Sequence, residues 1–218
     1  MTGPVDATLS PSVVWYFDFV SPYAYFGLHA LGRLPGGTQI QYRPILFAGL
    51  LKHWGQKGPA EIAPKRKWTY RSCIWLARHN QIPFRMPAAH PFNSLAFLRL
   101  AIAAGNTRTA VQTIFEALWT TGINPADPPV IEQLASQLSV PLERLGDVRV
   151  KDELRVNTER AVQSGVFGVP SLQVGNEVFW GSDAVDFAAA CLKDPGILDD
   201  EMRRADTLPI GAARPGSA

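Results

Sequence analysis

A run of large apolar residues near the N-terminus, residues 13–20 (VVWYFDFV), constrains the fold of this 218-residue chain more than any other feature. The run is β-branched and aromatic, which is typical of a strand, and its near-continuous apolarity indicates burial on both faces of a sheet. Ser21 and Pro22 follow at once, and serine before a first-turn proline marks the start of a helix. The sequence therefore predicts a buried strand that leads directly into a helix, which ends before the Pro-Gly-Gly at residues 35–37.

The middle of the chain has a helical pattern. Residues 39–43 (QIQYR) alternate polar and apolar side chains and predict a second strand. From residue 45 to residue 165 the apolar positions recur with helical spacing. Within this stretch, Asn93 and Asp127 are expected to begin helices, and a further helix is expected over residues 151–164.

Strand character returns near the C-terminus. Residues 171–174 and 177–180 flank a Gly-Asn pair, a two-residue loop with the chemistry of a β-hairpin. Ser182 and Asp183 follow and are expected to cap a last helix that runs to about residue 192. The chain thus ends on a hairpin and a helix.

The predicted order is β-α-β, then a helical block, then β-β-α, which predicts an α/β fold with one sheet built from both ends of the chain. This is the thioredoxin-like arrangement with an all-helical insertion. The expected divisions are a thioredoxin-like domain over 12–48 and 165–195, a helical insertion domain over 49–164, and flexible termini at 1–11 and 205–218.

Composition excludes several classes of partner. The net charge is +2 with a single short basic block at residues 65–67, so nucleic acid is not the expected partner. No apolar run reaches the ~18 residues that a membrane helix needs, and the first residues lack the features of a signal peptide. Cys73 and Cys191 are far apart in sequence and indicate neither a metal cluster nor a disulfide framework. We expect a cytoplasmic protein with reduced thiols and no bound metal.

Three short motifs carry the candidate chemistry, and each alone has an ordinary structural explanation. Ser21 can be a plain helix cap, since a serine hydroxyl without a base is a poor nucleophile. The Val169-Pro170 bond is a candidate cis peptide, or a trans proline at the first residue of a strand. Residues 179–183 (FWGSD) can be a turn followed by a helix cap. The three motifs together, in this order along the chain, are more specific than any one.

The motifs resemble those of a known family, the 2-hydroxychromene-2-carboxylate isomerases. These belong with kappa-class glutathione transferases in the disulfide-oxidoreductase branch of the thioredoxin superfamily. The resemblance runs from about residue 13 to residue 192, and the first and last motifs carry most of its specificity. The matching segments are FDFVSPY at 17–23, RPIL at 43–46, PFNSLA at 91–96, GVFGVP at 165–170 and FWGSD at 179–183.

The resemblance implies that glutathione is the cofactor. Ser21 matches the position where redox relatives carry the first cysteine of Cys-x-x-Cys. Residues 21–24 read Ser-Pro-Tyr-Ala, so disulfide exchange by that route is excluded. The implied role of Ser21 is to donate a hydrogen bond that, with the positive end of the helix, holds the glutathione sulfur as a thiolate. Ser21 is thus the predicted catalytic residue.

The remaining motif residues would hold the glutathione peptide. A cis bond before Pro170 would turn the backbone of Val169 outward, where it can pair with the cysteinyl main chain like an added strand. The helix N-terminus after Ser182 would take the γ-glutamyl carboxylate, and Asp183 would accept the ammonium group.

Three further residues have weaker cofactor-binding assignments from the resemblance. Trp180 and Gly181 would shape the γ-glutamyl end of the groove. Lys65 would pair with the glycyl carboxylate, or would simply lie on a solvated helix face.

The reaction that the resemblance implies is ring opening and cis–trans isomerisation of an aromatic-degradation intermediate, with glutathione as a recycled cofactor. The substrate is expected to be a small aromatic carboxylate. The wall of its binding site is expected to include Lys52, Glu61, Ile62 and His90. Relatives are usually dimers, so a homodimer is expected. Because residues 61, 62 and 90 differ from the characterised isomerase pattern, two alternatives stay open: a kappa-like transferase that releases a glutathione conjugate, and a non-catalytic binding module on the same scaffold.

Overall fold

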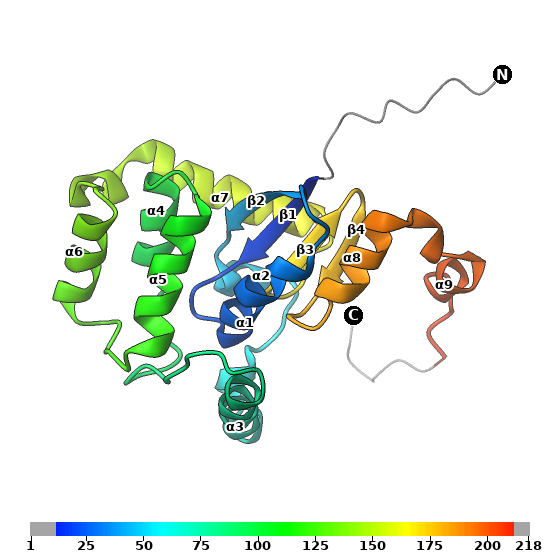
Figure 1. Cartoon of the computed structure of the whole chain (residues 1–218), viewed down its shortest axis with the longest axis horizontal. Coiled ribbons are helices and arrows are strands. Elements are labelled where there is room, and N and C mark those ends of the chain that lie inside the picture. The colour runs from blue at the N-terminus through cyan, green and yellow to red at the C-terminus, as the bar shows by residue number, and fades with distance from the viewer. Residues whose placement is uncertain (1–11, 212–218) are drawn as a thin grey trace.

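A computed structural model describes residues 12–211, and its centre is a four-stranded sheet in the order β2-β1-β3-β4 (Figure 1). Strand β1 (Ser12–Phe17) pairs in parallel with β2 (Gln39–Pro44), with Phe17 opposite Pro44. β3 (Ser171–Val174) runs antiparallel to β1, and β4 (Glu177–Trp180) runs antiparallel to β3 at the sheet edge. The prediction of an α/β, thioredoxin-like sheet built from both ends of the chain is confirmed.

Helix α1 (Pro22–Ala30) makes the crossover between the two parallel strands and continues as one 3₁₀ turn over Leu31–Arg33. Parallel neighbours need such a crossover, and a proline at the first helical position is compatible with the helix because the N–H it lacks would be unpaired there. The helix therefore begins at the carboxyl end of β1, with Ser21 between the two elements.

The long middle segment is largely helical, as the sequence predicts. It also contains an extended stretch between α3 and α4 and two 3₁₀ turns, Pro59–Glu61 and Leu142–Gly146. The helices are α2 (Phe47–His53), α3 (Ala63–His79), α4 (Leu95–Ala103), α5 (Arg108–Thr120), α6 (Pro128–Gln137) and α7 (Val148–Gln163). No helix in the described part of the chain is both long and apolar enough to span a bilayer.

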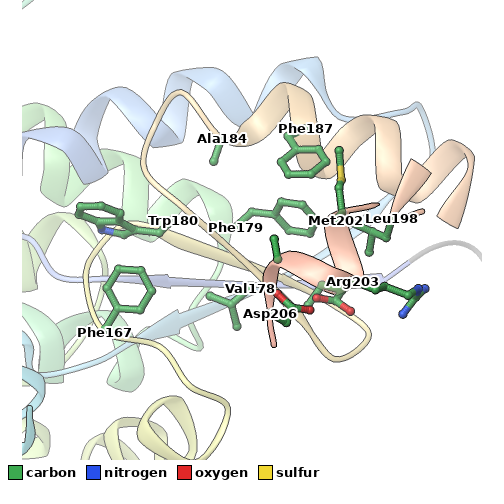
Figure 2. A pocket seen from close by; sticks show the side chains of 12 residues that line it. Phe167, Val178, Phe179, Trp180, Ala184, Phe187, Leu198, Met202, Arg203 and Asp206 are labelled. Atoms are coloured by element: carbon green, nitrogen blue, oxygen red, sulfur yellow. The ribbon is translucent and has the colours of Figure 1, made fainter. Parts of the chain in front are cut away.

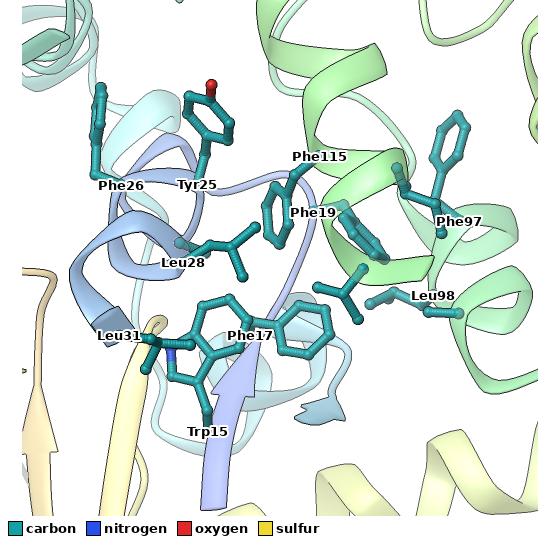
Figure 3. Close-up of a cluster of buried hydrophobic side chains, with 14 of the residues drawn as sticks. Trp15, Phe17, Phe19, Tyr25, Phe26, Leu28, Leu31, Phe97, Leu98 and Phe115 are labelled. Atoms are coloured by element: carbon teal, nitrogen blue, oxygen red, sulfur yellow. The ribbon is translucent and has the colours of Figure 1, made fainter. Parts of the chain in front are cut away.

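Helices cover both faces of the sheet, and β1 is buried between them (Figure 1). Trp15 and Phe17 point into the main core, where the Phe17 ring lies 5.7 Å from that of Phe115 on α5 (Figure 3). Tyr16 points to the other face and packs in a smaller cluster with Ala161 of α7. The alternation explains why residues 13–17 are apolar without interruption. The main core includes side chains from both the sheet and the helical insertion, and the predicted domain boundaries stay a prediction.

Two predicted boundaries near the site were wrong. The first strand ends at Phe17 rather than residue 20, because Asp18 turns the chain away from the sheet and bonds to other backbone groups. The last helix, α8 (Val185–Lys193), begins after Ser182 and Asp183, with Ala184 at the cap position and no side-chain cap. Ser182 and Asp183 instead belong to the turn that follows β4.

Smaller differences occur elsewhere. Asn93 does not occupy the cap position of α4, which Ser94 takes, although the Asn93 side chain accepts a hydrogen bond from the N–H of Leu95. α7 begins at Val148, three residues before the predicted start. Helix α9 (Asp200–Ala205), which follows a 3₁₀ turn at Pro195–Ile197, was not predicted from the sequence. The predicted flexible segment 1–11 and the end of the predicted segment 205–218, from residue 212, lie outside the described residues.

Candidate active site

Ser21 lies where the carboxyl end of β1 meets the N-terminus of α1. Its extended backbone (φ −91°, ψ 115°) makes it the cap residue, and its Oγ accepts a hydrogen bond from the N–H of Ala24 at 3.2 Å. The hydroxyl also donates to the carbonyl of Val169 across 3.4 Å, a long contact for a hydrogen bond between two oxygens. The side chain is only 7% exposed. Ser21 is therefore a helix cap, as the simplest interpretation holds, and also lies against the second predicted motif.

The Val169-Pro170 peptide bond is cis. The carbonyl of Pro170 accepts the N–H of Gly181 at 3.0 Å, which ties this segment to the third motif. Gly27 of α1 faces the proline, since a Cβ at that position would lie 3.0 Å from its Cγ. Within the described chain no backbone hydrogen bond joins Val169 to another residue, so apart from the long Ser21 contact at its carbonyl the main chain is available to pair with a bound peptide.

The turn after β4 brings the third motif next to the other two. The Trp180 indole is 56% exposed and covers Gly168, where a Cβ would overlap it. Gly181 has a φ of +111°, which favours glycine, and the Asp183 carboxylate occupies the space that a side chain at 181 would fill. The turn therefore depends on two glycines.

Arg33, which the sequence analysis did not single out, lies beside this turn. Its guanidinium donates to the carbonyl of Ser182 at 3.4 Å and pairs with Asp186 at 3.1 Å. The backbone N–H groups of Ser182 and Asp183 donate no backbone hydrogen bond in the described residues. The turn before α8 thus offers backbone N–H donors next to the Arg33–Asp186 ion pair, and nothing in the local sequence links residue 33 to it.

A groove of about 450 Å³, lined by both apolar and charged side chains, runs along β4 and α8 toward α9. Figure 2 shows Phe167 and Trp180 at one end and Leu198 and Met202 at the other. Ser21 does not line this groove. The groove extends the surface around Trp180 with side chains of α9, a helix that the sequence did not predict.

Asp18 carries a buried carboxylate, and its sequence position alone did not identify it as part of the site. Its two oxygens accept the N–H groups of Val20 at 3.0 Å and Phe47 at 2.9 Å. Burial raises the pKa of the Asp18 carboxyl, while the nearby Ser94 side chain and these hydrogen bonds oppose the rise. The carboxylate ties the loop before Ser21 to the start of α2, which has no side-chain cap of its own. A charged residue inside an apolar run was the available signal.

His90 and Trp119 bind the next two carbonyl groups of the same loop. The Trp119 indole N–H donates to the carbonyl of Phe19 at 3.0 Å, and His90 Nε2 lies 2.8 Å from the carbonyl oxygen of Val20. The Tyr70 hydroxyl lies 2.8 Å from both Nδ1 and the carbonyl oxygen of His90. Both ring nitrogens of His90 therefore have protein partners. The assignment of His90 to the substrate wall stays a prediction. In the structure the ring contacts the loop that leads to Ser21.

Desolvation of the His90 ring lowers its pKa below the usual 6.5, against the opposing effect of the Val20 carbonyl. The folded protein therefore binds this proton less readily than the unfolded chain, so the stability contributed by the neutral ring is full above pH ~6.5 and is lost as the pH falls through the folded pKa. We expect the stability advantage of the native protein over the non-titrating His90→Gln variant to shrink between about pH 8 and pH 5. Urea unfolding of both proteins at the two pH values measures it, and an unchanged difference would contradict the prediction.

The other predicted site residues lie on the helical insertion. Lys52 is exposed near the end of α2, and Lys65 is exposed in the first turn of α3. The Glu61 carboxylate accepts the N–H of Gly58 at 2.6 Å, and Ile62 is the half-buried cap residue of α3. The hydrogen bonds of the described residues link Ser21 directly to Val169, and Pro170 to Gly181, but link none of these four insertion residues to Ser21.

The two thiols do not contribute to the site. Cys73 and Cys191 are free and buried. Burial raises the pKa of the Cys73 thiol to about 12 and also raises that of Cys191, so neither is a ready nucleophile. The described residues contain no group of three or more acidic, histidine or cysteine side chains arranged to hold a metal ion.

Known proteins of similar sequence include an isomerase and a glutathione transferase. A 2-hydroxychromene-2-carboxylate isomerase of Sphingobium xenophagum is 29% identical over 195 residues, which cover 85% of this chain and all of that protein. Glutathione S-transferase kappa 2 of Caenorhabditis elegans is 27% identical over 207 residues, which cover 84% of this chain and 92% of that protein.

The fold comparison points the same way. A solved 2-hydroxychromene-2-carboxylate isomerase structure superimposes with a TM-score of 0.75 at 23% identity, over 91% of this chain and 100% of that chain. The resemblance inferred from the motifs is confirmed by these relatives. A family model described as DSBA-like thioredoxin domain matches residues 12–193, and the chain belongs to this family.

Proposed function

We propose that the protein is a glutathione-dependent cis–trans isomerase that acts on 2-hydroxychromene-2-carboxylate or a related aromatic-degradation intermediate. Relatives named as this isomerase, at 28–29% identity, support an isomerase, and relatives named as kappa glutathione transferases support glutathione as the cofactor. The homodimer and the cytoplasmic location stay predictions.

One observation carries the proposal: a hydroxyl, not a thiol, caps α1 directly beside the Val169 carbonyl. A chain with no thiol at Ser21 or Ala24 cannot exchange disulfides there, so a sulfur nucleophile at this place would come from a bound molecule. The surroundings fit a tripeptide thiol. Among the described residues, the Val169 main chain has no backbone partner, and no backbone group accepts the N–H of Ser182 or Asp183, which leaves both donors for a carboxylate.

When bound, glutathione would supply a thiolate able to add to a conjugated carbon of the substrate and to leave again, so that the ring can open and the former double bond can rotate before it re-forms. Ser21 would donate a hydrogen bond from its hydroxyl to the sulfur anion, and the N-terminal end of α1 would add its positive partial charge. The Ser21 hydroxyl is free to turn from Val169, since their 3.4 Å contact is weak.

Other residues bind and orient the cofactor. The Val169 backbone, with Pro170 behind it, pairs with the cysteinyl unit, and Ser182 and Asp183 bind the γ-glutamyl end. Trp180 and Gly181 shape the groove there. Lys65 pairs with the glycyl carboxylate.

The aromatic substrate is proposed to lie between the sheet and the helical insertion. Its wall consists of Lys52, Glu61, Ile62 and His90. Lys52 supplies a positive charge for the substrate carboxylate.

A turnover experiment tests the function. The protein is incubated with 2-hydroxychromene-2-carboxylate and glutathione at one tenth of the substrate concentration, and both pools are followed by chromatography. An isomerase converts all the substrate and leaves the glutathione intact. If substrate persists and glutathione also fails to shift the melting temperature, a non-catalytic binding module is the better interpretation.

A kappa-like transferase is the second candidate, and the kappa 2 relative at 27% identity favours it. The same experiment separates the two, because a transferase consumes one glutathione for each product molecule and stops when the pool is spent.

The Gly181→Ala variant is expected to weaken glutathione binding about tenfold with a stability loss of about 1 kcal/mol. Its φ of +111° disfavours a side chain, and the new Cβ would push the Asp183 carboxylate aside. Calorimetric titration measures the affinity. Gly175→Ala is the matched control, since Gly175 has a φ of +59° and open space around it. The control should lose similar stability and keep its affinity; equal affinity in both variants would contradict the prediction.

A further inference from the structure

The peptide unit that joins Val20 to Ser21 is held at both ends. Its N–H, on Ser21, donates to the carbonyl of Asp18 at 3.0 Å. Its carbonyl, on Val20, lies 2.8 Å from Nε2 of His90. Because the rotation of this peptide plane sets the direction in which the next residue leaves the chain, the two bonds together determine how the Ser21 side chain is presented.

The proton positions at His90 follow from its partners. The Val20 carbonyl can only accept a hydrogen bond, so Nε2 must be the protonated nitrogen of the ring. In the neutral ring Nδ1 is then an acceptor, and the single Tyr70 hydroxyl proton lies between Nδ1 and the carbonyl oxygen of His90, each 2.8 Å from the hydroxyl oxygen. The Val20 carbonyl therefore sets the tautomer, and the Tyr70 hydroxyl holds the ring from the side opposite Val20.

Aromatic packing fixes the plane of the His90 ring. It meets the rings of Tyr70, Trp119 and Phe92 at centroid separations of 5.3, 5.5 and 6.1 Å, all edge-on. Trp119 in turn donates to the carbonyl of Phe19, one residue before Val20. The helical insertion thus binds two successive carbonyl groups of the loop that ends at Ser21, from residues about seventy and one hundred positions away in sequence.

We propose that His90 and Tyr70 are a positioning pair for Ser21: Tyr70 orients the His90 ring, and the His90 Nε2–H fixes the Val20 carbonyl and, through that peptide unit, the Ser21 hydroxyl. The inference rests on the proposed function, because Ser21 matters only if it stabilises a bound thiolate. His90 acts through the backbone rather than by contact with the sulfur. A Val20 carbonyl without this donor can rotate, which turns Ser21 away from the sulfur and moves the negative end of a peptide dipole.

Three variants test the pair: His90→Leu removes the donor, His90→Gln keeps a side-chain N–H, and Tyr70→Phe removes only the orienting hydroxyl. The first readout is the pH midpoint of thiolate formation in bound glutathione, followed by ultraviolet absorbance. We expect His90→Leu to raise the midpoint by about one pH unit, a tenfold loss of thiolate below the midpoint. His90→Gln should restore at least half of the shift, and Tyr70→Phe should give a smaller rise than His90→Leu.

The second readout uses the protein without glutathione. The amide nitrogen shift of Ser21 in NMR spectra reports on the hydrogen bond to the preceding carbonyl, and we expect it to move in His90→Leu but not in His79→Leu, a surface control on α3. An unchanged Ser21 signal, or a native thiolate midpoint in His90→Leu, would overturn the positioning role. If the native protein binds no glutathione while the Ser21 signal moves as expected, the proposed function fails and the loop contact stands without the catalytic role.

Discussion

Replacing Ser21 with alanine is expected to lower turnover of the chromene carboxylate by about 10²–10³-fold, the usual effect of removing one hydrogen bond to a catalytic anion. The bound thiol should need a higher pH to ionise, because only the helix end would then favour the anion. The fold should survive: the variant loses the cap bond to the Ala24 N–H, which costs about 1 kcal/mol. Steady-state kinetics, with the midpoint of urea unfolding, measure both effects.

Thr107 provides the matched control for this variant. Its Oγ1 caps α5 by accepting the N–H of Ala110 at 3.2 Å, the same bond length as at Ser21, but in a helix whose start is not part of the site. Thr107→Ala should lose a similar amount of stability and keep its turnover. If Ser21→Ala turns over at the native rate, or if both variants lose activity equally, Ser21 has no catalytic role.

The Asp18→Ala variant is expected to destabilise the protein by about 3 kcal/mol or more, a larger loss of stability than that expected for Ser21→Ala. The substitution leaves the partly buried N–H groups of Val20 and Phe47 without their acceptor, and an unpaired buried donor costs about 1–3 kcal/mol. Relief of the desolvation that raises the Asp18 pKa offsets part of this cost. Chemical unfolding measures the loss, and Asp18→Asn, which keeps one acceptor oxygen, should be intermediate.

Asp186 is the control for Asp18. Its carboxylate pairs with Arg33 on the surface, where the two side chains are 65% and 49% exposed. Asp186→Ala should therefore cost about 1 kcal/mol or less. A loss for Asp18→Ala that is no greater than this would show that the loop before Ser21 does not depend on the buried carboxylate.

Features encoded by neighbouring residues could be predicted from the sequence. The Gly-Asn loop correctly predicted the hairpin and its strands at 171–174 and 177–180. The pair Ser21-Pro22 correctly predicted the start of α1. The candidate cis bond at Val169 was also visible, because proline is the residue that permits it. The near-continuous run of apolar residues from 13 to 20 predicted a strand buried on both faces.

Features that depend on distant residues could not be predicted in this way. The Ser-Asp pair at residues 182–183 has the composition of a helix cap, yet Gly181 and the contact with Arg33 keep it in a turn, so α8 starts later. The contact of His90 with Val20 joins residues seventy positions apart, and no local pattern encodes it. The Lys52, Glu61 and Ile62 assignments came from a rough correspondence across gaps and stay predictions.

Stabilisation of a bound glutathione thiolate by the Ser21 hydroxyl can be measured by a pH titration of glutathione bound to the native protein. Its thiolate absorbance is compared with that of free glutathione at the same concentration. We expect the thiolate to persist below the usual thiol pKa of about 8.5 in the native protein, and its midpoint to shift toward the free value in Ser21→Ala. A native midpoint equal to that of free glutathione, with no heat of binding in calorimetry, would contradict it.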